Sequence, residues 1–560
     1  MKTTYIVKPL AILWLLMLAA VITPRFTSAQ TTWANTDGTG AWTTNTNWDP
    51  VAVPTTGDVV TIGNGGTARL GPGESGSATT VDVNLNSGLL IEGGTMALGN
   101  FNINSGTVTV TASGSLNTVN GAGIAGQLNV TDGGKVVLTR QLTLGYTNAT
   151  QGHILVDGTG SSLTANLTPA LGHNGLATVT VQNGGYASFN GATIGGYTAA
   201  GWGTTVITVD HAWINLGNAD MGRGTSTGTM HISNSGSATV GSFSIGSGVQ
   251  NSVSNNMVTV DGTGSRLIAS TSLNVGNTSK GTLNLQDGGE VTINAGSGTM
   301  LLANSVSGTG ISTGTLNIGG ETIGAKTAGT VTAAAVTVGD GTGFINFNQN
   351  GNTTFNAVIT QGTGTGTLTV THNATGTTTF TKVNTYTGPT NITAGKLIID
   401  VGASIGSGIV TVSASAALGG GGAIGGETFI NTGATLAPDG ILTFESGLTI
   451  SNTATLEFTT DDVIMVTDGV LDLGAGIKLN LASTGTYTLF NYTGADLEGA
   501  GNWNSWDLGE FGGAGYTRAW TNGEGVLSLT VTPIPEPGTW VMIFSGLGTL
   551  AGIQRLRRRK

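Results

Sequence analysis

Apolar and polar residues alternate over short segments between residues 128 and 293, and Gly, Asp, Asn and Ser interrupt these segments regularly. Every 24 to 27 residues a strand-like segment ends at one of seven turn residues: Asp132, Asp157, Asn183, Asp210, Asn234, Asp261 and Asp287. Six residues after each turn residue comes an apolar side chain: Leu138, Leu163, Phe189, Leu216, Val240, Leu267 and Ile293. Short alternating segments rich in Val, Thr, Ile and Leu predict half-buried strands. A fixed period of this length predicts a solenoid whose coils stack on one another.

Two turn sequences alternate along this stretch. In one set a single residue separates the last apolar strand residue from the turn residue, as in Val130-Thr131-Asp132; in the other set none does, as in Val156-Asp157. We expect all seven turn residues to share one phase of the coil, where their side chains cap turns and form ladders. The alternative is Ca²⁺ held between stacked carboxylates.

We therefore predict an all-β chain that forms a parallel β-helix. With about 25 residues per coil and strands about 4.8 Å apart, roughly 450 residues would give on the order of 15 coils. The crossover preference of parallel strands favours a right-handed coil. The 560 residues include 95 Gly and no Cys, and only 9% are charged. This composition excludes disulfides and thiolate metal sites. The net charge of −11 argues against a nucleic-acid partner.

Residues 1–29 have the pattern of a secretory signal peptide, with Lys2 and Lys8 before the apolar run 11–22 and cleavage expected between Ala29 and Gln30. An uncleaved membrane anchor is the alternative. Residues 30–75 form a Trp-rich segment that we expect to cap the first coil; its tryptophans are Trp33, Trp42 and Trp48. Repeats should occupy 76–440, and 441–532 should hold more strands and a second cap containing Trp503, Trp506 and Trp520.

Residues 365–440 differ from the earlier repeats. They contain the segments Asn384-Thr-Tyr-Thr-Gly388, Thr390-Asn-Ile-Thr-Ala-Gly395, Ala417–Gly426 and Gly433-Ala-Thr-Leu-Ala-Pro438. These segments closely resemble the autotransporter-associated β-strand repeat of passenger domains. The Trp-rich opening is similar to the start of many exported bacterial β-helix proteins. The resemblance implies a right-handed parallel β-helix at a bacterial cell surface.

Residues 533–560 join a Pro535-Glu536-Pro537 motif to the apolar segment 540–553 and a basic tail, whose cations are Arg555, Arg557, Arg558, Arg559 and Lys560. This arrangement resembles the PEP-CTERM sorting signal of Gram-negative bacteria. The resemblance implies a transient transmembrane helix in the inner membrane and processing by an exosortase partner. The product would reach the outer surface or an exopolysaccharide matrix. A plain C-terminal anchor is the alternative.

No catalytic motif, metal site or cofactor site is predicted. The basic residues of the repeats lie at five different distances from the preceding turn residue, so they should share no column; they are Lys135, Arg140, Arg223, Arg266 and Lys280. His153 and His231 share a phase but lie three coils apart, roughly 14 Å, which is too far to share a metal ion.

Tyr186 and Trp213 each follow a turn residue by three positions on neighbouring coils. If they face outward, they could form a stacking platform for sugars; otherwise they are isolated exposed aromatic residues. We expect a secreted structural or adhesive protein associated with an exopolysaccharide-rich biofilm. The alternatives are a polysaccharide-active β-helix enzyme, which needs two carboxylates about 5–10 Å apart in a groove, and an adhesin that binds glycans through its Trp-rich ends.

Overall fold

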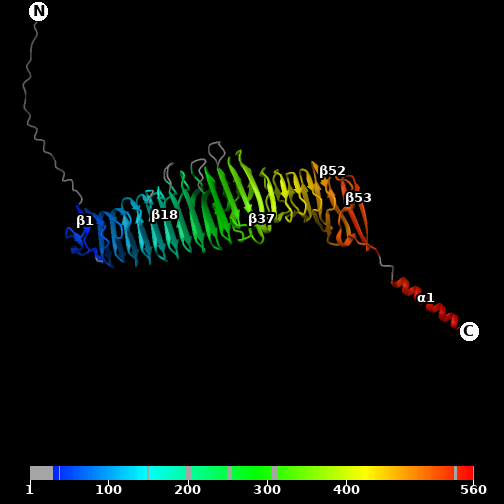
Figure 1. Ribbon diagram of the computed structural model, residues 1–560, viewed down its shortest axis with the longest axis horizontal. Coiled ribbons are helices and arrows are strands. Elements are labelled where there is room, and N and C mark those ends of the chain that lie inside the picture. The colour runs from blue at the N-terminus through cyan, green and yellow to red at the C-terminus, as the bar shows by residue number, and fades with distance from the viewer. Residues whose placement is uncertain are drawn as a thin grey trace, which may run out of the picture.

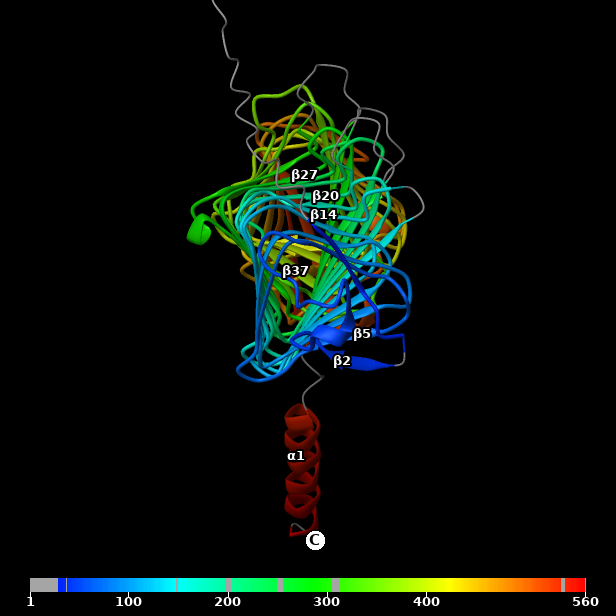
Figure 2. The same cartoon turned by 90° about the vertical axis from the view of Figure 1, so that its left-hand side faces the viewer.

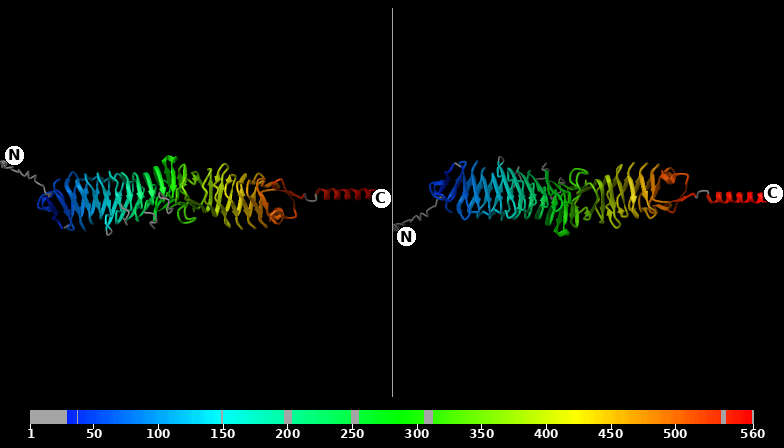
Figure 3. Two further views of the ribbon diagram at one scale, coloured as in Figure 1. Left: turned by 90° about the horizontal axis from the view of Figure 1, so that it is seen from above. Right: turned by 90° about the horizontal axis from the view of Figure 1, so that it is seen from below.

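The computed structural model describes residues 29–36, 38–147, 150–196, 203–248, 255–304, 312–534 and 539–558. These residues form a single long rod, with β1 (Gln30–Trp33) at one end and β53 (Tyr516–Gly523) at the other (Figure 1). The views from above and below show the same straight rod (Figure 3). The expected signal peptide and the Pro535-Glu536-Pro537 motif lie outside the described residues, apart from Ala29 and Gln30.

Coils of the N-terminal half place strand segments on three faces, and in some coils one long strand covers two of these faces. In one coil, β12 (Gln127–Thr131) lies on the first face, β13 (Lys135–Leu138) on the second and β14 (Leu142–Leu144) on the third. Each pairs in parallel with its counterpart one coil further on. The described chain makes about 18 such turns, which confirms the predicted parallel β-solenoid. Figure 2 looks along the rod and shows successive coils lying over one another. The right-handed sense stays a prediction.

The repeats that contain the seven turn residues supply seven strands to the first face and seven to the second. On the first face β12 is followed by β15 (Gln151–Asp157), β18 (Leu176–Gln182), β21 (Thr204–Asp210), β24 (Thr227–Ser233), β26 (Asn255–Asp261) and β28 (Lys280–Gln286). On the second face β13 is followed by β16 (Ser162–Ala165), β19 (Tyr186–Phe189), β22 (Trp213–Asn215), β25 (Ser237–Ile245), β27 (Arg266–Val275) and β29 (Glu290–Ile293).

The core is a continuous column of apolar side chains inside the coils. All seven apolar residues that follow the turn residues by six positions are at most 3% exposed, as predicted. They do not form one column, however, because Leu163 pairs with Val136 and Ala187, whereas Leu138 pairs with Ala165. In several coils a small residue in one column accompanies a larger one in the other, as in Leu163 with Ala165, Ala187 with Phe189 and Leu267 with Ala269. This compensation keeps the interior volume of successive coils similar, as close packing requires.

Three tryptophans close the N-terminal end of the core. Trp33, Trp42 and Trp48 are at most 2% exposed, and the rings of Trp33 and Trp42 each lie 4.7 Å from that of Trp48, edge to face. The Trp48 indole N–H donates a hydrogen bond to the carbonyl oxygen of Trp42. Edge-to-face aromatic pairs add to the apolar burial. The cluster covers the end of the first coil that the structure describes.

The cross-section of the rod changes between residues 330 and 405. The second face ends at β32 (Thr330–Thr332), and from β35 (Thr353–Phe355) a new second face pairs within the same sheet as the first. The third face stops at β36 (Val358–Thr360) and resumes in a separate sheet at β39 (Ser404–Ile405). The Asn384 side chain fills this gap: its oxygen accepts a hydrogen bond from the Ile359 N–H, and its amide donates to the Ser404 carbonyl.

Beyond this junction the coils are shorter. Each consists of strands such as β40 (Val410–Val412), β41 (Ala417–Gly420) and β42 (Ala423–Ile424), repeated up to β49 (Val470–Leu473), β50 (Lys478–Leu481) and β51 (Gly485–Asn491). The third face ends in an antiparallel hairpin of β53 and β54 (Val526–Pro533), which pairs with β51. Trp506 packs edge to face against Trp520 at this end.

A single helix, α1 (Thr539–Arg557), follows the rod. We expected a transmembrane helix here, and that expectation is not supported: within the described residues, no helix is both long and apolar enough to cross a bilayer. Arg555 and Arg557 lie in the last turn of the helix.

Candidate functional site

The second face of the N-terminal half carries two large aromatic side chains on its outer surface. Tyr186 of β19 and Trp213 of β22 are direct register partners on neighbouring coils. They are 43% and 52% exposed, whereas the residues that alternate with them, Ala187 and Ile214, are buried. The pair therefore points outward from adjacent rungs, about 4.8 Å apart along the rod. The two side chains therefore meet the condition stated for a sugar-stacking platform, namely that both face outward.

The aromatic pair belongs to a longer column of outward residues. Register partners along β13, β16, β19, β22, β25 and β27 place six side chains in one row: Lys135, Ser162, Tyr186, Trp213, Ser237 and Arg266. We call this row the aromatic strip. Two positions further along the same strands lie Val137, Thr164, Ser188, Asn215, Thr239 and Ile268.

The strip corrects the prediction that the basic residues share no column. Lys135 and Arg266 lie in the same column, five rungs apart. Counting from the turn residue failed because the turn after Asp132 is shorter than the turn before Arg266, so the same column falls at different offsets. Arg140 and Arg223 lie outside the strands, and Lys280 begins β28 on the first face.

The seven turn residues lie in two columns, which corrects the single column predicted. Asp157 pairs with Thr131 and Gln182, so it ends a strand. Asp132 lies one position further on and has a φ of 48°. The same left-handed position is taken by Gly158 and Gly262 in the alternate coils. The alternation in sequence therefore has a structural cause: a coil places an Asn or Asp, a glycine or, after Asp210, His211 where the backbone is left-handed.

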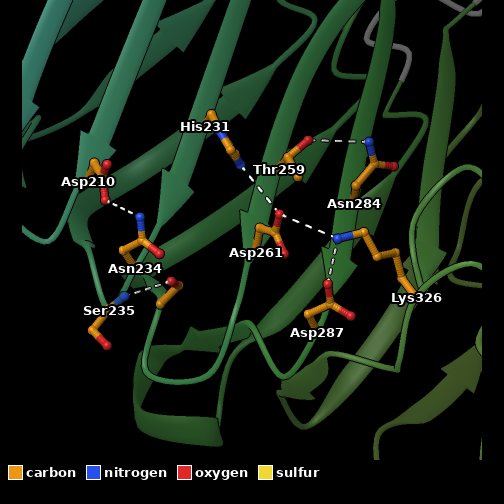
Figure 4. A network of polar contacts seen from close by, with 10 residues as sticks. Asp210, His231, Asn234, Ser235, Thr259, Asp261, Asn284, Asp287 and Lys326 are labelled. Carbon is orange, nitrogen blue, oxygen red and sulfur yellow. Dashed lines mark hydrogen bonds and ion pairs between the residues drawn. The ribbon is translucent and has the colours of Figure 1, made fainter.

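The two columns are linked by hydrogen bonds across neighbouring coils. The Asn183 amide donates to the Asp157 carboxylate over 2.8 Å, and the Asn234 amide donates to Asp210 over 2.6 Å. Figure 4 shows the second of these links beside the next coils of the network. These contacts agree with the capping and ladder interpretation of the turn residues.

A lysine occupies the place where two of the turn carboxylates come together. Lys326, from the segment between β31 (Thr313–Ile318) and β32, lies 2.6 Å from the Asp287 carboxylate and 4.0 Å from that of Asp261 (Figure 4). The hydrogen bond from Lys326 holds the pKa of Asp287 below its ordinary value, although partial burial opposes this. The same bond raises the pKa of Lys326. Among the described residues, no three His, Asp or Glu side chains gather to hold a metal ion.

The histidines are also arranged differently from the prediction. His153 does not share a column with His231, because the residue of β24 in its column is Thr229. His231 instead lies 3.7 Å from the Asp261 carboxylate. The mixed turn lengths again explain the error, since the two histidines were placed by their distance from turn residues in different columns.

The burial of one histidine was not predicted from the sequence. His372 of β37 (Thr367–Phe380) is fully buried, with Phe347 and Ile392 as its register partners. Its Nδ1 lies 2.8 Å from the Ala394 carbonyl oxygen, which identifies Nδ1–H as the donor, and its Nε2 has no hydrogen-bond partner. Burial lowers the pKa of His372. The alternation of the strand, in which Leu368, Val370 and His372 share one parity, was the signal available in the sequence.

The C-terminal half has a groove of about 430 Å³ over the second face, lined in part by Lys396, Asp439, Glu457 and Asp462. Asp462 is 3% exposed and accepts hydrogen bonds from the backbone N–H groups of Gly440 and Thr459, so it is a structural residue. Asp439 and Glu457 are exposed. A second groove of about 660 Å³ is lined mainly by glycines and small polar residues, with Glu445 at its border.

The fold defines the chain as an all-β parallel solenoid of about 18 turns, and its most distinctive outer surface is the aromatic strip. No protein-family model matches the chain. An alignment 315 residues long, which covers 53% of this chain, shows 32% identity to the adhesin BmaC autotransporter of Brucella suis biovar 1 (strain 1330). The matched region spans 8% of that adhesin's length. The similarity and the solenoid agree with the resemblance to autotransporter passenger domains.

Proposed function

We propose that this chain is an exported adhesive protein of the bacterial surface, in which the solenoid serves as a rigid display rod. The observation that carries the proposal is the parallel stacking over about 18 turns, in a chain whose similarity lies with an adhesin. A stacked rod holds its outward side chains at a fixed spacing, so weak contacts with an extended partner add up along its length. The protein thereby binds through its sides and not through an enclosed active site.

The terminal segments support an exported location. Residues 1–29 have the signal-peptide pattern, and the Pro535-Glu536-Pro537 motif with its basic tail resembles a sorting signal. We therefore assign the tail to recognition and cleavage by an exosortase, and the mature rod to an exopolysaccharide-containing matrix outside a Gram-negative cell. The right-handed coil of passenger domains is part of the same proposal.

Fractionation of the native host tests this proposal. Antibody labelling of intact cells should detect the rod at the surface. Mass spectrometry of the mature protein should find Gln30 at its N-terminus and the tail removed. A deletion strain should attach less to surfaces and regain attachment when the gene is restored. A rod confined to the cytoplasm would contradict the proposal.

The sorting step has its own test. Replacing Pro535, Glu536 and Pro537 with alanines should leave the C-terminal peptide on the mature protein, because the recognition motif is lost. A matched variant that replaces Thr530, Thr532 and Pro533 with alanine, just upstream, should be processed normally. Identical processing of both variants would remove the exosortase from the account.

The groove with Asp439 and Glu457 favours a second candidate function, a polysaccharide-active enzyme. Exposed carboxylates beside Lys396 in one groove are the residues that glycosidic bond cleavage requires. Incubation with a panel of polysaccharides should then release reducing ends or unsaturated products, and Glu457→Gln should abolish the release. An equal rate for wild type and Glu457→Gln would reject this candidate.

A further inference from the structure

The aromatic strip has a symmetric order along the rod. Lys135 and Arg266 lie at its two ends, Ser162 and Ser237 come next, and the aromatic pair occupies the centre. Six rungs at about 4.8 Å spacing place the two cationic ends roughly 24 Å apart. A ligand that contacts the whole strip must therefore be linear and run along the rod axis.

The charge of the strip contrasts with the rest of the chain. The protein has 30 Asp and Glu against 19 Lys and Arg. Yet on the second face the outward positions of these six strands contain two cations and no carboxylate; besides the strip itself they are Val137, Thr164, Ser188, Asn215, Thr239 and Ile268. Glu290, one rung further on, lies 3.4 Å from the Arg266 guanidinium. Because the Arg266 side chain is 56% exposed, this pair is weak and leaves the cation able to bind a ligand.

The central aromatic pair defines the uncharged part of the ligand. Exposed Tyr and Trp faces bind flat apolar surfaces, and their polar tips remain hydrated. The C–H face of a pyranose ring is such a surface, and its hydroxyl groups can bond to the flanking Ser188, Asn215 and Thr239 side chains. A carbohydrate chain therefore fits the centre of the strip, and negative groups on that chain fit its ends.

We propose that the aromatic strip binds a linear anionic polysaccharide of the uronic acid class. This proposal rests on the proposed adhesive function. Two neighbouring sugar rings stack on Tyr186 and Trp213. Carboxylates of sugars further along the chain reach Lys135 on one side and Arg266 on the other. The ligand lies parallel to the rod axis and crosses the strands of the second face.

Isothermal titration calorimetry of the purified full chain with a defined oligogalacturonate tests the site. The methyl ester of the same oligomer is the matched ligand, since it keeps the sugar faces and removes the charges. The acid form should bind about tenfold or more tightly than the ester, and its binding should weaken as salt screens the cations. Equal binding of both forms, or binding of neither, would overturn the proposal.

Variants locate the site on the rod. Trp213→Ala and Tyr186→Ala should each weaken binding of both oligomers by about tenfold or more. Lys135→Gln should weaken binding of the acid form alone and so reduce the preference for acid over ester. Phe429→Ala and Lys478→Gln, an outward aromatic residue and an exposed lysine of the C-terminal half, serve as matched controls and should bind like wild type. An unchanged Trp213→Ala variant with a wild-type melting curve would overturn the assignment.

A failure of the ligand proposal can be distinguished from a failure of the proposed adhesive function. A surface-located rod that promotes attachment but binds no oligogalacturonate would leave the adhesive role intact and reject the strip as its ligand site. A rod that binds through Trp213 but is found only inside the cell would confirm the strip and reject the surface role.

Discussion

The two halves of the rod are built by the same backbone pairing, but they present different surfaces. Register partners on the first face are 23 to 28 residues apart between β12 and β28, and 18 to 23 apart between β38 (Thr390–Ile399) and β49. The longer coils have room for wide polar turns and outward side chains. Glycines make close backbone approaches in both halves: a Cβ at Gly134 would lie 2.1 Å from the Val110 carbonyl oxygen, and one at Gly420 would lie 2.1 Å from the Ile399 carbonyl oxygen.

The two halves therefore share the packing that stabilises the rod but differ in the outward side chains that could bind a ligand. Stacking of inward apolar residues is the same in both halves, with Leu216 and Leu436 both fully buried. The outward side chains differ between the halves. The aromatic strip and the hydrogen-bonded turn residues lie on the long coils, whereas the grooves lined by Glu457 and Glu445 lie on the short coils. The junction at residues 330–405 joins the two designs through buried polar side chains, including His372 and Asn384.

The largest effect should come from a charge placed in the core of either half. Leu216→Asp and Leu436→Asp should each lower the free energy of unfolding by about 3–5 kcal/mol, because each buries an unpaired carboxylate. Differential scanning calorimetry shows whether the halves unfold together. One shifted transition in both variants means a single cooperative rod, and two separately shifted transitions mean independent halves. Unaltered melting of Leu216→Asp would show that its inward placement is wrong.

The junction should be the pH-sensitive part of the rod. Burial lowers the pKa of His372 below its ordinary value of 6.5, so the unfolded chain binds a proton more readily than the folded one. Stability is therefore complete above this ordinary value and decreases as the pH falls below it. The melting temperature should fall between about pH 7.5 and pH 5.5, and the fall should be smaller in His372→Gln. An identical pH profile in the variant would contradict this account.

The left-handed turn positions of the long coils should discriminate between side chains. Asn183 has a φ of 53°, and the equivalent residue three coils away in the other set, Gly262, has a φ of 89°. Asn183→Val should cost about 1–2 kcal/mol because a β-branched residue is strained there. Asn183→Gly is the control and should cost less, since it loses the hydrogen bond to Asp157 but not the backbone conformation. Equal losses in urea unfolding would assign the whole effect to the hydrogen bond.

The smallest effect should come from Lys326. Lys326→Met removes the ion pair with Asp287 and should cause a slight loss of stability at neutral pH. The pKa of Asp287 is lowered from its ordinary 3.8, so this contribution exists above that value and disappears as the pH falls below it. High salt should also reduce the difference from wild type. A difference that persists at low pH and high salt would indicate lost packing.

The repeat pattern alone was enough to predict the parallel solenoid and the inward side of each strand. Leu138 and Leu163 are both buried as expected, although they belong to different columns. It also placed Tyr186 and Trp213 on neighbouring coils, because both follow a turn residue by the same number of positions. The error came from treating each turn residue as one fixed phase. Unequal turns shifted Lys135 and Arg266 into one column and separated His153 from His231.

Local sequence therefore determined which residues form strands and which side of each strand faces the core, because alternation with a period of two is a property of one strand. Only the tertiary structure decided which residues of different coils lie side by side, since that depends on the accumulated length of every turn between them. The contact of Lys326 with Asp287, the burial of His372 at the junction and the order of the aromatic strip are all of this second kind.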